Sequence, residues 1–317
     1  MINILVIGVS NIFRKRVLPA LLSLKCVDRI DLASRSNPID IPIPSGKKGE
    51  VFCGYREALT QAKKGLAYVS LPNSLHAEWV ETALLEGFHV VVDKPAFINT
   101  EDSLRLRELA KSKGLCLSEA TVWPFQSQIQ LAQEQIKLNK SDIKLVQATF
   151  SFPPFDPQNF RNSKELGGGA FNDLGIYALS PGRVFFDTYP DEIVIRSSPI
   201  GSGHQVDTAF SLSALYSGGR IFQGFFSFET EYKNSMRLLG PDIAIDIEPA
   251  FTSGGNGGCI VIKRNNKSNK LPYTTNDGFS TYFKGVIESI TKGDWGEWDN
   301  ILAHDSENIK EARKGIA

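Results

Sequence analysis

Short apolar runs alternate with helical patterns along the first 120 residues, and this alternation constrains the fold more than any other feature of the chain. The predicted strands are Ile2–Gly8, Arg29–Ala33, Leu66–Leu71, Phe88–Val92 and Leu115–Ser118. The predicted helices between them are Arg14–Leu24, Ser74–Leu85 and Glu101–Lys113. Strands that alternate with helices predict an α/β domain with a doubly wound parallel sheet.

Two segments interrupt this rhythm. Pro19 lies inside the first helical pattern, so that helix is either kinked or begins late. Asn37–Gly49 contains three prolines and two glycines where a crossover helix is expected. We interpret it as a surface loop that replaces most of the helix.

The second half of the chain has a different hydrophobic pattern. Several of its runs alternate apolar and polar residues, as half-buried antiparallel strands do. These runs are Lys144–Phe152, Glu192–Ser197, Asp207–Tyr216, Arg220–Phe228, Ser235–Leu239, Ile243–Ile247 and Gly258–Lys263. Helices are predicted at Phe171–Phe186 and Phe279–Thr291, and a polar loop at Asn265–Gly278. We therefore expect a first domain at 1–121, and at 122–317 an α+β domain with a large, mostly antiparallel, open-faced sheet.

Composition excludes several classes of protein. Lys+Arg and Asp+Glu are both 35, whereas a nucleic-acid-binding protein usually has a basic excess. No apolar run approaches the roughly 20 residues of a membrane span, and the N-terminus lacks the features of a signal peptide. The four cysteines show neither metal-ligand nor redox spacing. We expect no metal site, reduced thiols and a cytoplasmic location.

The turn after the first strand, Gly8-Val9-Ser10-Asn11-Ile12-Phe13, occupies the position of a dinucleotide-binding Gly-x-Gly-x-x-Gly motif. Only its first glycine is present. Gly8 can make the tight turn, and Ser10 is small enough to let a pyrophosphate approach. An ordinary strand–turn–helix connection explains these residues equally well.

Ser34 and Arg35 follow the second strand, where NAD sites usually have an acid and NADP sites offer arginine and hydroxyl groups. The strand tip has no acid, although Asp31 lies inside the strand. A guanidinium can bind a 2′-phosphate bidentately. This favours NADP(H), with NAD(H) possible and a solvated Arg35 as the alternative.

Asp93-Lys94-Pro95 follows a buried strand at the sheet edge where α/β proteins bind ligands. An ammonium at that edge can polarise a substrate carbonyl. A lysine in a surface turn is the alternative.

A glycine cluster, Gly167–Gly169, leads into a predicted helix on which Asp173 and Tyr177 are four residues apart. They therefore share a face and could position a substrate and transfer a proton. A helix N-terminal acid and a half-buried tyrosine explain them structurally. The glycines indicate that the backbone of this segment packs closely against a neighbouring group.

Together these segments resemble the Gfo/Idh/MocA family of oxidoreductases. The matching stretches are the Gly8 loop, SR at 34–35, LPNSLHAEWVETALLEGFHVVVDKP at 71–95, SEA at 118–120 and GGGAFNDLGIY at 167–177. RKRVLPALL, LHAEW, SFPP…FR and Tyr rather than His at 177 are similar to the sugar-nucleotide 3-ketoreductase branch.

The resemblance implies a Rossmann domain followed by an α+β domain whose open sheet forms a homodimer or homotetramer. It implies NADP(H)-dependent hydride transfer on a sugar-like carbonyl or alcohol, with a nucleotide-linked keto sugar as substrate. Lys94, Tyr177 and Asp173 would be catalytic, and Arg161 would join them in contacting the substrate. The implied cofactor residues are Gly8, Ser10, Asn11, Ile12, Ser34, Arg35, Leu71, Pro72, Asn73, His76, Asp93 and Lys94.

Three departures from the family pattern leave alternatives open. Asp93 replaces the usual glutamate, the first loop lacks its later glycines, and 120–126 lacks the family's usual residues, so Trp123 either lines the pocket or belongs to the core. One alternative is a dehydrogenase of a free sugar, polyol or dihydrodiol. The other is a non-catalytic NADP-binding regulator.

Overall fold

The computed structural model describes residues 1–35, 41–198, 205–252, 257–274 and 277–316. They pack as two compact units, one made of Met1–Thr121 with Phe279–Ala303 and the other of Val122–Gly278 with His304–Ala317. Among these residues no helix is both long enough and apolar enough to cross a membrane.

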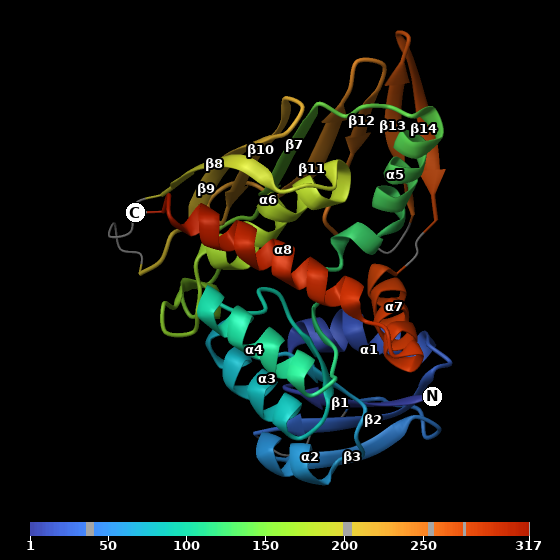
Figure 1. Cartoon of the computed structure of the whole chain (residues 1–317), viewed down its shortest axis with the longest axis vertical. Helices are drawn as coiled ribbons and strands as arrows, with labels where there is room; N and C mark the ends of the chain where they lie inside the picture. The colour runs from blue at the N-terminus through green and yellow to red at the C-terminus, as the bar shows by residue number, and fades with distance from the viewer. Residues whose placement is uncertain (36–40, 199–204, 253–256, 275–276, 317) are drawn as a thin grey trace. The chain divides into compact units, whose positions relative to one another are not determined.

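The first unit contains a parallel sheet of six strands in the order β3-β2-β1-β4-β5-β6 (Figure 1). The strands are β1 (Ile2–Ile7), β2 (Val27–Ser34), β3 (Lys48–Cys53), β4 (Leu66–Val69), β5 (His89–Val92) and β6 (Leu117–Glu119). Apolar runs form β1, β4 and β5 because the central strands of such a sheet are buried on both faces. The strand order reverses between β1 and β4, as in a dinucleotide-binding fold.

Helices cross over between these strands. They are η1 (Phe13–Val17), α1 (Leu18–Ser23), α2 (Tyr55–Gln61), η2 (Asn73–Leu75), α3 (His76–Leu85) and α4 (Thr100–Ser112). Pro19 lies inside a helical segment that begins at Asn11 and continues through a π-helical turn at Phe13–Val17 into α1, so the helix does not begin late. Proline lacks the N–H that a regular α-helical hydrogen bond needs, and the π-helical turn directly precedes it.

The predicted loop at Asn37–Gly49 is confirmed in part. Residues 36–40 lie outside the described residues, and 41–47 form a loop that ends in a turn at 45–47, but Lys48 and Gly49 already belong to β3. β3 and the short helix α2 were missed by the sequence analysis. β3 is mostly exposed and polar, so it lacks the apolar run by which buried strands are predicted.

The C-terminal helices α7 (Gly278–Lys292) and α8 (Gly296–Arg313) depart from the simple domain division at 121/122. Residues Phe279–Ala303 pack with the first unit. The reason is aromatic packing and hydrogen bonding: Phe283 contacts Tyr68 with ring centroids 5.6 Å apart, and the Tyr282 hydroxyl donates to the Glu119 carbonyl at 2.8 Å.

The second unit contains an eight-stranded sheet in the order β14-β13-β12-β11-β7-β10-β9-β8. Its strands are β7 (Leu145–Ser151), β8 (Pro190–Ser197), β9 (Ala209–Tyr216), β10 (Arg220–Ser227), β11 (Lys233–Leu239), β12 (Ala244–Ile247), β13 (Gly258–Arg264) and β14 (Lys267–Tyr273). Every pairing is antiparallel except that of β7 with β10. The predicted fold class is therefore confirmed for both parts of the chain.

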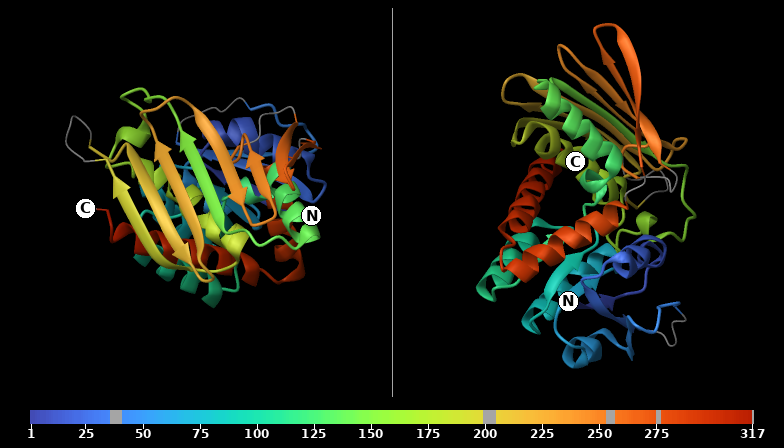
Figure 2. Two further views of the ribbon diagram at one scale, coloured as in Figure 1. Left: turned by 90° about the horizontal axis from the view of Figure 1, so that it is seen from above. Right: turned by 90° about the vertical axis from the view of Figure 1, so that its right-hand side faces the viewer.

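One face of this sheet packs against helices α5 (Ser127–Asn139) and α6 (Ala170–Phe186). The short helices η3 (Trp123–Phe125) and η4 (Phe160–Asn162) precede them. Buried side chains such as Phe210, Phe222 and Phe226 fill the layer between sheet and helices. In the left view of Figure 2 the strands lie in front of the helices of this unit, with their other face toward the viewer.

The prediction of a polar loop at Asn265–Gly278 was wrong for Lys267–Tyr273, which form β14, and residues 275–276 of that stretch lie outside the described residues. Asn265 and Asn266 have φ values of 49° and 61° and form a two-residue turn, after which β14 pairs with β13 from Arg264↔Lys267 onward. Two left-handed residues are typical of a type I′ hairpin. β14 is a largely exposed edge strand, so its sequence is polar.

Candidate active site

The carboxyl ends of β1, β2, β4 and β5 lie along one edge of the parallel sheet, because the strands run in the same direction. The loops that leave this edge carry the predicted cofactor residues. The structure therefore brings the turns at residues 8–12, 34–35, 71–76 and 93–95 to one side of the first unit.

Gly8 follows β1 and has a φ of +90°, which a residue with a side chain rarely adopts. A Cβ there would lie 2.5 Å from Leu71 Cδ2 and closer still to the Ser70 carbonyl oxygen. Glycine is thus required at this position because the segment after β4 passes directly against the turn.

A chain of hydrogen bonds runs from this turn to the end of β5. Ser10 Oγ accepts from the Phe13 N–H at 3.0 Å and lies 2.7 Å from Ser70 Oγ. Ser70 Oγ donates to Asp93 Oδ2 at 2.5 Å, and the Tyr68 hydroxyl donates to Asp93 Oδ1. The turn is therefore tied to the strand that carries Lys94.

Asp93 is the centre of this network. Removal of its carboxylate from water raises its pKa, although hydrogen bonds from Ser70 and Tyr68 and electrostatic interaction with His76 and Lys94 oppose the shift. Burial and the neighbouring Asp93 charge raise the pKa of the Tyr68 phenol well above its usual value. Tyr68 consequently keeps its proton and acts as the donor.

The turn that carries Lys94 is held from both sides. Glu119, at the end of β6, accepts a hydrogen bond from the Ala96 N–H at 2.7 Å, and His76 contacts the Pro95 carbonyl oxygen at 2.8 Å. The Lys94–Pro95 peptide bond is cis. Lys94 itself is half-buried.

At the end of β2, Ser34 is half-buried and Arg35 is exposed. Asp31 lies inside the strand, fully buried, where it accepts hydrogen bonds from Arg29 Nε and the Glu50 N–H, each at 2.7 Å. The only acid of this strand's second half therefore points into the structure rather than standing at its tip.

In the second unit, the glycine cluster brings Arg161 to the first turn of α6. A Cβ on Gly168 would lie 2.6 Å from the Arg161 carbonyl carbon and 2.7 Å from the Phe160 oxygen. The Gly169 N–H donates to the Arg161 carbonyl at 2.8 Å. The close backbone approach that the sequence indicated is thus made with the segment of η4.

Arg161 and Asp173 form an ion pair, with Arg161 Nε 2.8 Å from Asp173 Oδ2. Asp173 is buried, whereas Arg161 remains partly exposed and stacks over Phe155 and Phe160. The guanidinium keeps N–H groups beyond the one bonded to Asp173, because it has five. An anionic or hydroxyl-bearing ligand could use them.

Tyr177 lies one helical turn after Asp173, half-buried between two aromatic rings. The Phe150 and Phe251 ring centroids are each 5.1 Å from that of Tyr177, with interplanar angles of 86° and 62°. Such edge-to-face packing fixes the orientation of the Tyr177 ring and therefore the direction in which its hydroxyl group points.

The segment 120–126 supports this aromatic site. Trp123 is fully buried and its Nε1 donates to Ser180 Oγ at 2.9 Å, so it belongs to the core. Gln126 donates to the Phe251 carbonyl at 2.9 Å, and the Phe251 N–H donates to Asn234 Oδ1 at 2.8 Å. The buried amide side chains of Gln126 and Asn234 therefore hold the backbone of Phe251, whose ring packs against Tyr177.

Several residues of this site were missed by the sequence analysis. Tyr68 is a tyrosine in a buried parallel strand, which indicates a polar partner in the core and could have been noticed. The contact of Gln126 with Phe251 joins segments 125 residues apart, and Asn234 lies 17 residues from Phe251, so no local pattern predicts either contact.

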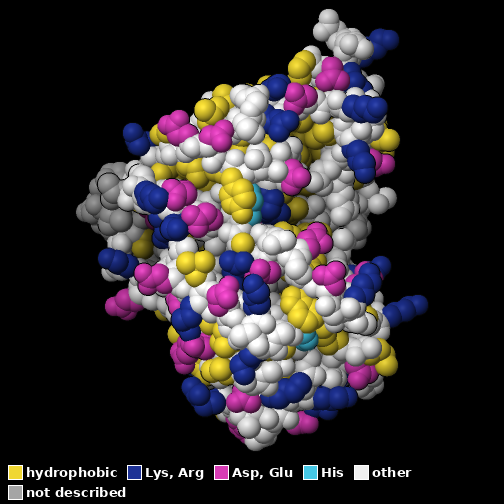
Figure 3. All heavy atoms as spheres, in the orientation of Figure 1, with side chains coloured by type: hydrophobic (Ala, Val, Ile, Leu, Met, Phe, Trp, Pro, Cys, Tyr) yellow, Lys and Arg dark blue, Asp and Glu magenta, His cyan; other side chains and the backbone are white. Residues whose placement is uncertain are grey.

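Charges of both signs are interspersed on the face shown in Figure 3, where dark blue Lys and Arg side chains lie among magenta Asp and Glu side chains. This distribution agrees with the equal numbers of basic and acidic residues.

Comparison with known protein families identifies the family to which this chain belongs. Residues 2–121 match the oxidoreductase family with an NAD-binding Rossmann fold, and residues 141–245 match the GFO/IDH/MocA C-terminal domain. The chain carries both domains and belongs to the GFO/IDH/MocA family of oxidoreductases, as the sequence resemblance indicated.

Two curated relatives and one solved structure illustrate the similarity. dTDP-3,4-didehydro-2,6-dideoxy-alpha-D-glucose 3-reductase of Saccharopolyspora spinosa is 26% identical over 96% of this chain and 92% of its own. D-xylose 1-dehydrogenase (NADP(+)) 2 of Haloferax volcanii is 26% identical over 78% and 75%. KijD10, a 3-ketoreductase from Actinomadura kijaniata in complex with NADP and TDP-benzene, superposes with a TM-score of 0.87 at 24% identity, covering 99% and 98%.

Proposed function

We propose that this chain transfers hydride between NADP(H) and the keto or hydroxyl group of a nucleotide-linked sugar. The observation that carries the proposal is that one chain has a Rossmann sheet with Lys94 directly after β5 and also a helix on which Tyr177 follows the Arg161-bound Asp173 by one turn.

The sheet edge of the first unit fits a dinucleotide. The helical segment after Gly8 begins at Asn11, and both Asn11 and Ile12 are exposed. First-turn N–H groups have no acceptor in their own helix and lie at its positive end, so they suit a pyrophosphate. Leu71, Pro72 and Asn73 lie on the neighbouring loop, at the switch point between β1 and β4.

The cofactor preference follows from Ser34 and Arg35. The exposed Arg35 guanidinium can bind the 2′-phosphate of NADPH bidentately, and Asp31 is fully buried with its Oδ1 already hydrogen-bonded to Arg29 and the Glu50 N–H. We expect NADPH to bind more tightly than NADH.

In the reaction, the bound nicotinamide supplies or accepts the hydride. Negative charge that develops on the substrate oxygen is stabilised by the Lys94 ammonium. Tyr177 gives its phenolic proton to that oxygen during reduction and takes it back during oxidation. Asp173 and Arg161 hold the sugar or its linked group, Arg161 through the N–H groups that Asp173 does not use.

A nucleotide-linked keto sugar is the substrate we favour over a free sugar. Several curated relatives are reductases of a dTDP-linked keto sugar, and the solved relative KijD10 was crystallised with TDP-benzene. The D-xylose dehydrogenase relative supports the free-sugar alternative.

The experiment measures NADPH oxidation with dTDP-linked 3-keto sugars and NADP+ reduction with free aldoses and polyols. We expect turnover with the first group, and Lys94→Met and Tyr177→Phe each to reduce it on the order of a hundredfold or more while NADPH still binds. Lys111→Met and Tyr189→Phe are matched controls at exposed positions. Turnover with free sugars alone would favour the dehydrogenase, and cofactor binding without any turnover would favour a regulator.

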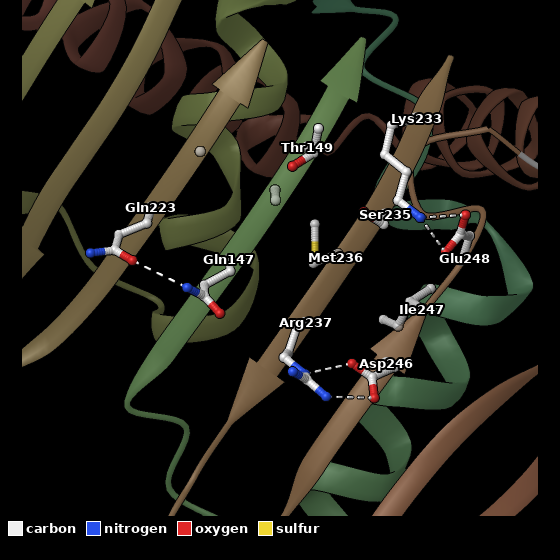
Figure 4. Close-up of a pocket in the computed structure, with 12 residues that line it drawn as sticks. Gln147, Thr149, Gln223, Lys233, Ser235, Met236, Arg237, Asp246, Ile247 and Glu248 are labelled. Atoms are coloured by element: carbon white, nitrogen blue, oxygen red, sulfur yellow. Dashed lines mark hydrogen bonds and ion pairs between the residues drawn. The ribbon is translucent and has the colours of Figure 1, made fainter. Parts of the chain in front are cut away.

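We also propose that the open face of the eight-stranded sheet joins copies of this chain. A polar depression on this face is lined by β7, β10, β11 and β12 (Figure 4). Its charges are already paired: Arg237 Nε lies 2.6 Å from Asp246 Oδ1, and Lys233 Nζ lies 2.8 Å from Glu248. Leu215 and Phe225 on the same face are exposed. Sedimentation of the wild-type chain should therefore show a dimer or tetramer that Phe225→Glu dissociates.

A further inference from the structure

His76 occupies an unusual position for a histidine, because it is fully buried and both of its ring nitrogens face backbone carbonyl oxygens. It is the first residue of α3. Its Nδ1 lies 2.8 Å from the Pro95 oxygen, on the turn that carries Lys94. Its Nε2 lies 2.9 Å from the Leu71 oxygen, on the loop after β4.

The chemistry of the two partners fixes the role of the ring. A backbone carbonyl oxygen can only accept a hydrogen bond, whereas a neutral imidazole has one donor and one acceptor. In a neutral ring one nitrogen lone pair would therefore face an oxygen lone pair at hydrogen-bonding distance. Both bonds form only when both nitrogens carry hydrogen.

We propose that His76 is held as a doubly protonated imidazolium that clamps the Leu71–Asn73 loop to the Lys94–Pro95 turn and so positions Lys94 relative to the cofactor loop. The positioning role rests on the proposed function, whereas the protonation state does not. His76 is a positioning residue here, because the two main-chain segments it joins bear the residues predicted to touch the cofactor.

The charged groups around the ring suit a cation. Asp93, directly after β5, interacts electrostatically with His76. Glu119 is held by Ala96 and Thr121, and Glu78 in the first turn of α3 is exposed. Lys94 is the one basic residue on the same turn, and Asp93 beside it offsets its charge.

His89, in strand β5 of the same unit, provides a contrast within the chain. Its Nδ1 accepts a hydrogen bond from the Cys116 N–H at 2.9 Å, so that nitrogen carries no hydrogen. Burial lowers the pKa of His89, in agreement with a neutral ring. The structure thus assigns opposite protonation states to two histidines of one unit.

Nitrogen NMR of the full chain, labelled with [15N]histidine, tests the protonation state directly. The chain has four histidines. Substituting His89, His204 and His304 one at a time assigns their signals and leaves His76 by elimination, so no folded His76 variant is needed. Near neutral pH we expect both His76 nitrogens at the shift of protonated nitrogen, and His89 Nδ1 at the much higher shift of an unprotonated one. An unprotonated nitrogen in His76 would overturn the proposal.

Cofactor binding tests the clamp. His76→Gln keeps one amide donor, which can reach only one of the two carbonyls. Loss of a hydrogen bond from a charged donor corresponds to about tenfold in an equilibrium constant. We expect the NADPH Kd of His76→Gln to rise on the order of tenfold, and that of the control His89→Gln to stay within twofold of wild type.

The NADPH Kd separates a clamp from a passive core residue, because His76→Gln loses one of the two hydrogen bonds that join the Leu71 loop to the turn of Lys94. Equal Kd values for wild type and His76→Gln would refute the positioning role. Failure of turnover with an intact His76 signature would instead count against the proposed function alone.

Discussion

Replacing Tyr68 by phenylalanine removes one hydroxyl from the network around Asp93 and leaves the packing of the ring almost unchanged. Tyr68 is fully buried, and its hydroxyl donates to Asp93 Oδ1. The variant keeps the Ser70 hydrogen bond to Oδ2 at 2.5 Å. The carboxylate therefore loses one of its two hydroxyl donors in a site from which water is largely removed.

The size of the effect follows from the kind of bond. A hydrogen bond to a charged group contributes about 1.5–3 kcal/mol to stability. We expect Tyr68→Phe to lower the free energy of unfolding by about 2 kcal/mol near neutral pH. Tyr189→Phe, which removes an exposed tyrosine's hydroxyl, should change it by less than about 0.5 kcal/mol.

The loss of unfolding free energy in Tyr68→Phe should depend on pH in a definite direction. Burial already raises the pKa of Asp93 in the folded chain, and loss of the Tyr68 donor raises it further. Above the variant's raised pKa both proteins hold an ionised Asp93 and the deficit is complete. As the pH falls through that pKa, Asp93 of the variant becomes protonated first, so the deficit shrinks.

Urea unfolding of the full chain, followed by circular dichroism at neutral and mildly acidic pH, measures this difference. A smaller deficit at the lower pH supports the network. A Tyr68→Phe variant as stable as Tyr189→Phe, or a deficit that does not change with pH, would refute the reasoning.

Three further predictions concern the glycines, the alkaline range and the cofactor. Gly168→Ala should lower the free energy of unfolding by about 1–3 kcal/mol and raise the KM for the sugar substrate, because its Cβ would displace the backbone of Arg161. The control is Gly46→Ala, at a position where a Cβ meets no atom within 4 Å. It should change neither quantity in the same thermal and kinetic assays. Burial raises the pKa of Cys116 from 9.0 to about 12. The folded chain then keeps a proton that the unfolded chain loses, so the free energy of unfolding should fall as pH rises through that window, and Cys116→Ala should reduce the slope by up to about 1.4 kcal/mol per pH unit in urea titrations. Arg35→Ala should weaken binding of NADPH but not of NADH in calorimetry, and equal losses for both would contradict the 2′-phosphate assignment.

The fold could be predicted from sequence where burial leaves a pattern. The central strands β1, β4 and β5 are buried on both faces, so they appear as apolar runs, and alternating strands and helices then predict the sheet. The edge strands β3 and β14 are exposed, and their polar sequences resemble loops. The Asn265–Asn266 turn was the local signal that could have revealed β14.

The positions of the site residues along the chain could be predicted from the sequence, but the contacts between these residues could not. The glycine cluster indicated a close backbone approach, but its partner, the Arg161 carbonyl, was not specified by the sequence. His76 resembles a solvated or capping residue by its place at a helix start, and only the fold shows that it is buried between two carbonyls.

The most direct test of the central claim is isotope transfer from the cofactor. NADPH deuterated at the transferable position of the nicotinamide ring is incubated with a dTDP-linked 3-keto sugar and wild-type chain, and the product is analysed by mass spectrometry. We predict one deuterium on the carbon of the reduced keto group, with transfer strongly slowed in Tyr177→Phe and Lys94→Met. A product without deuterium, or transfer at wild-type rate in both variants, would contradict the account.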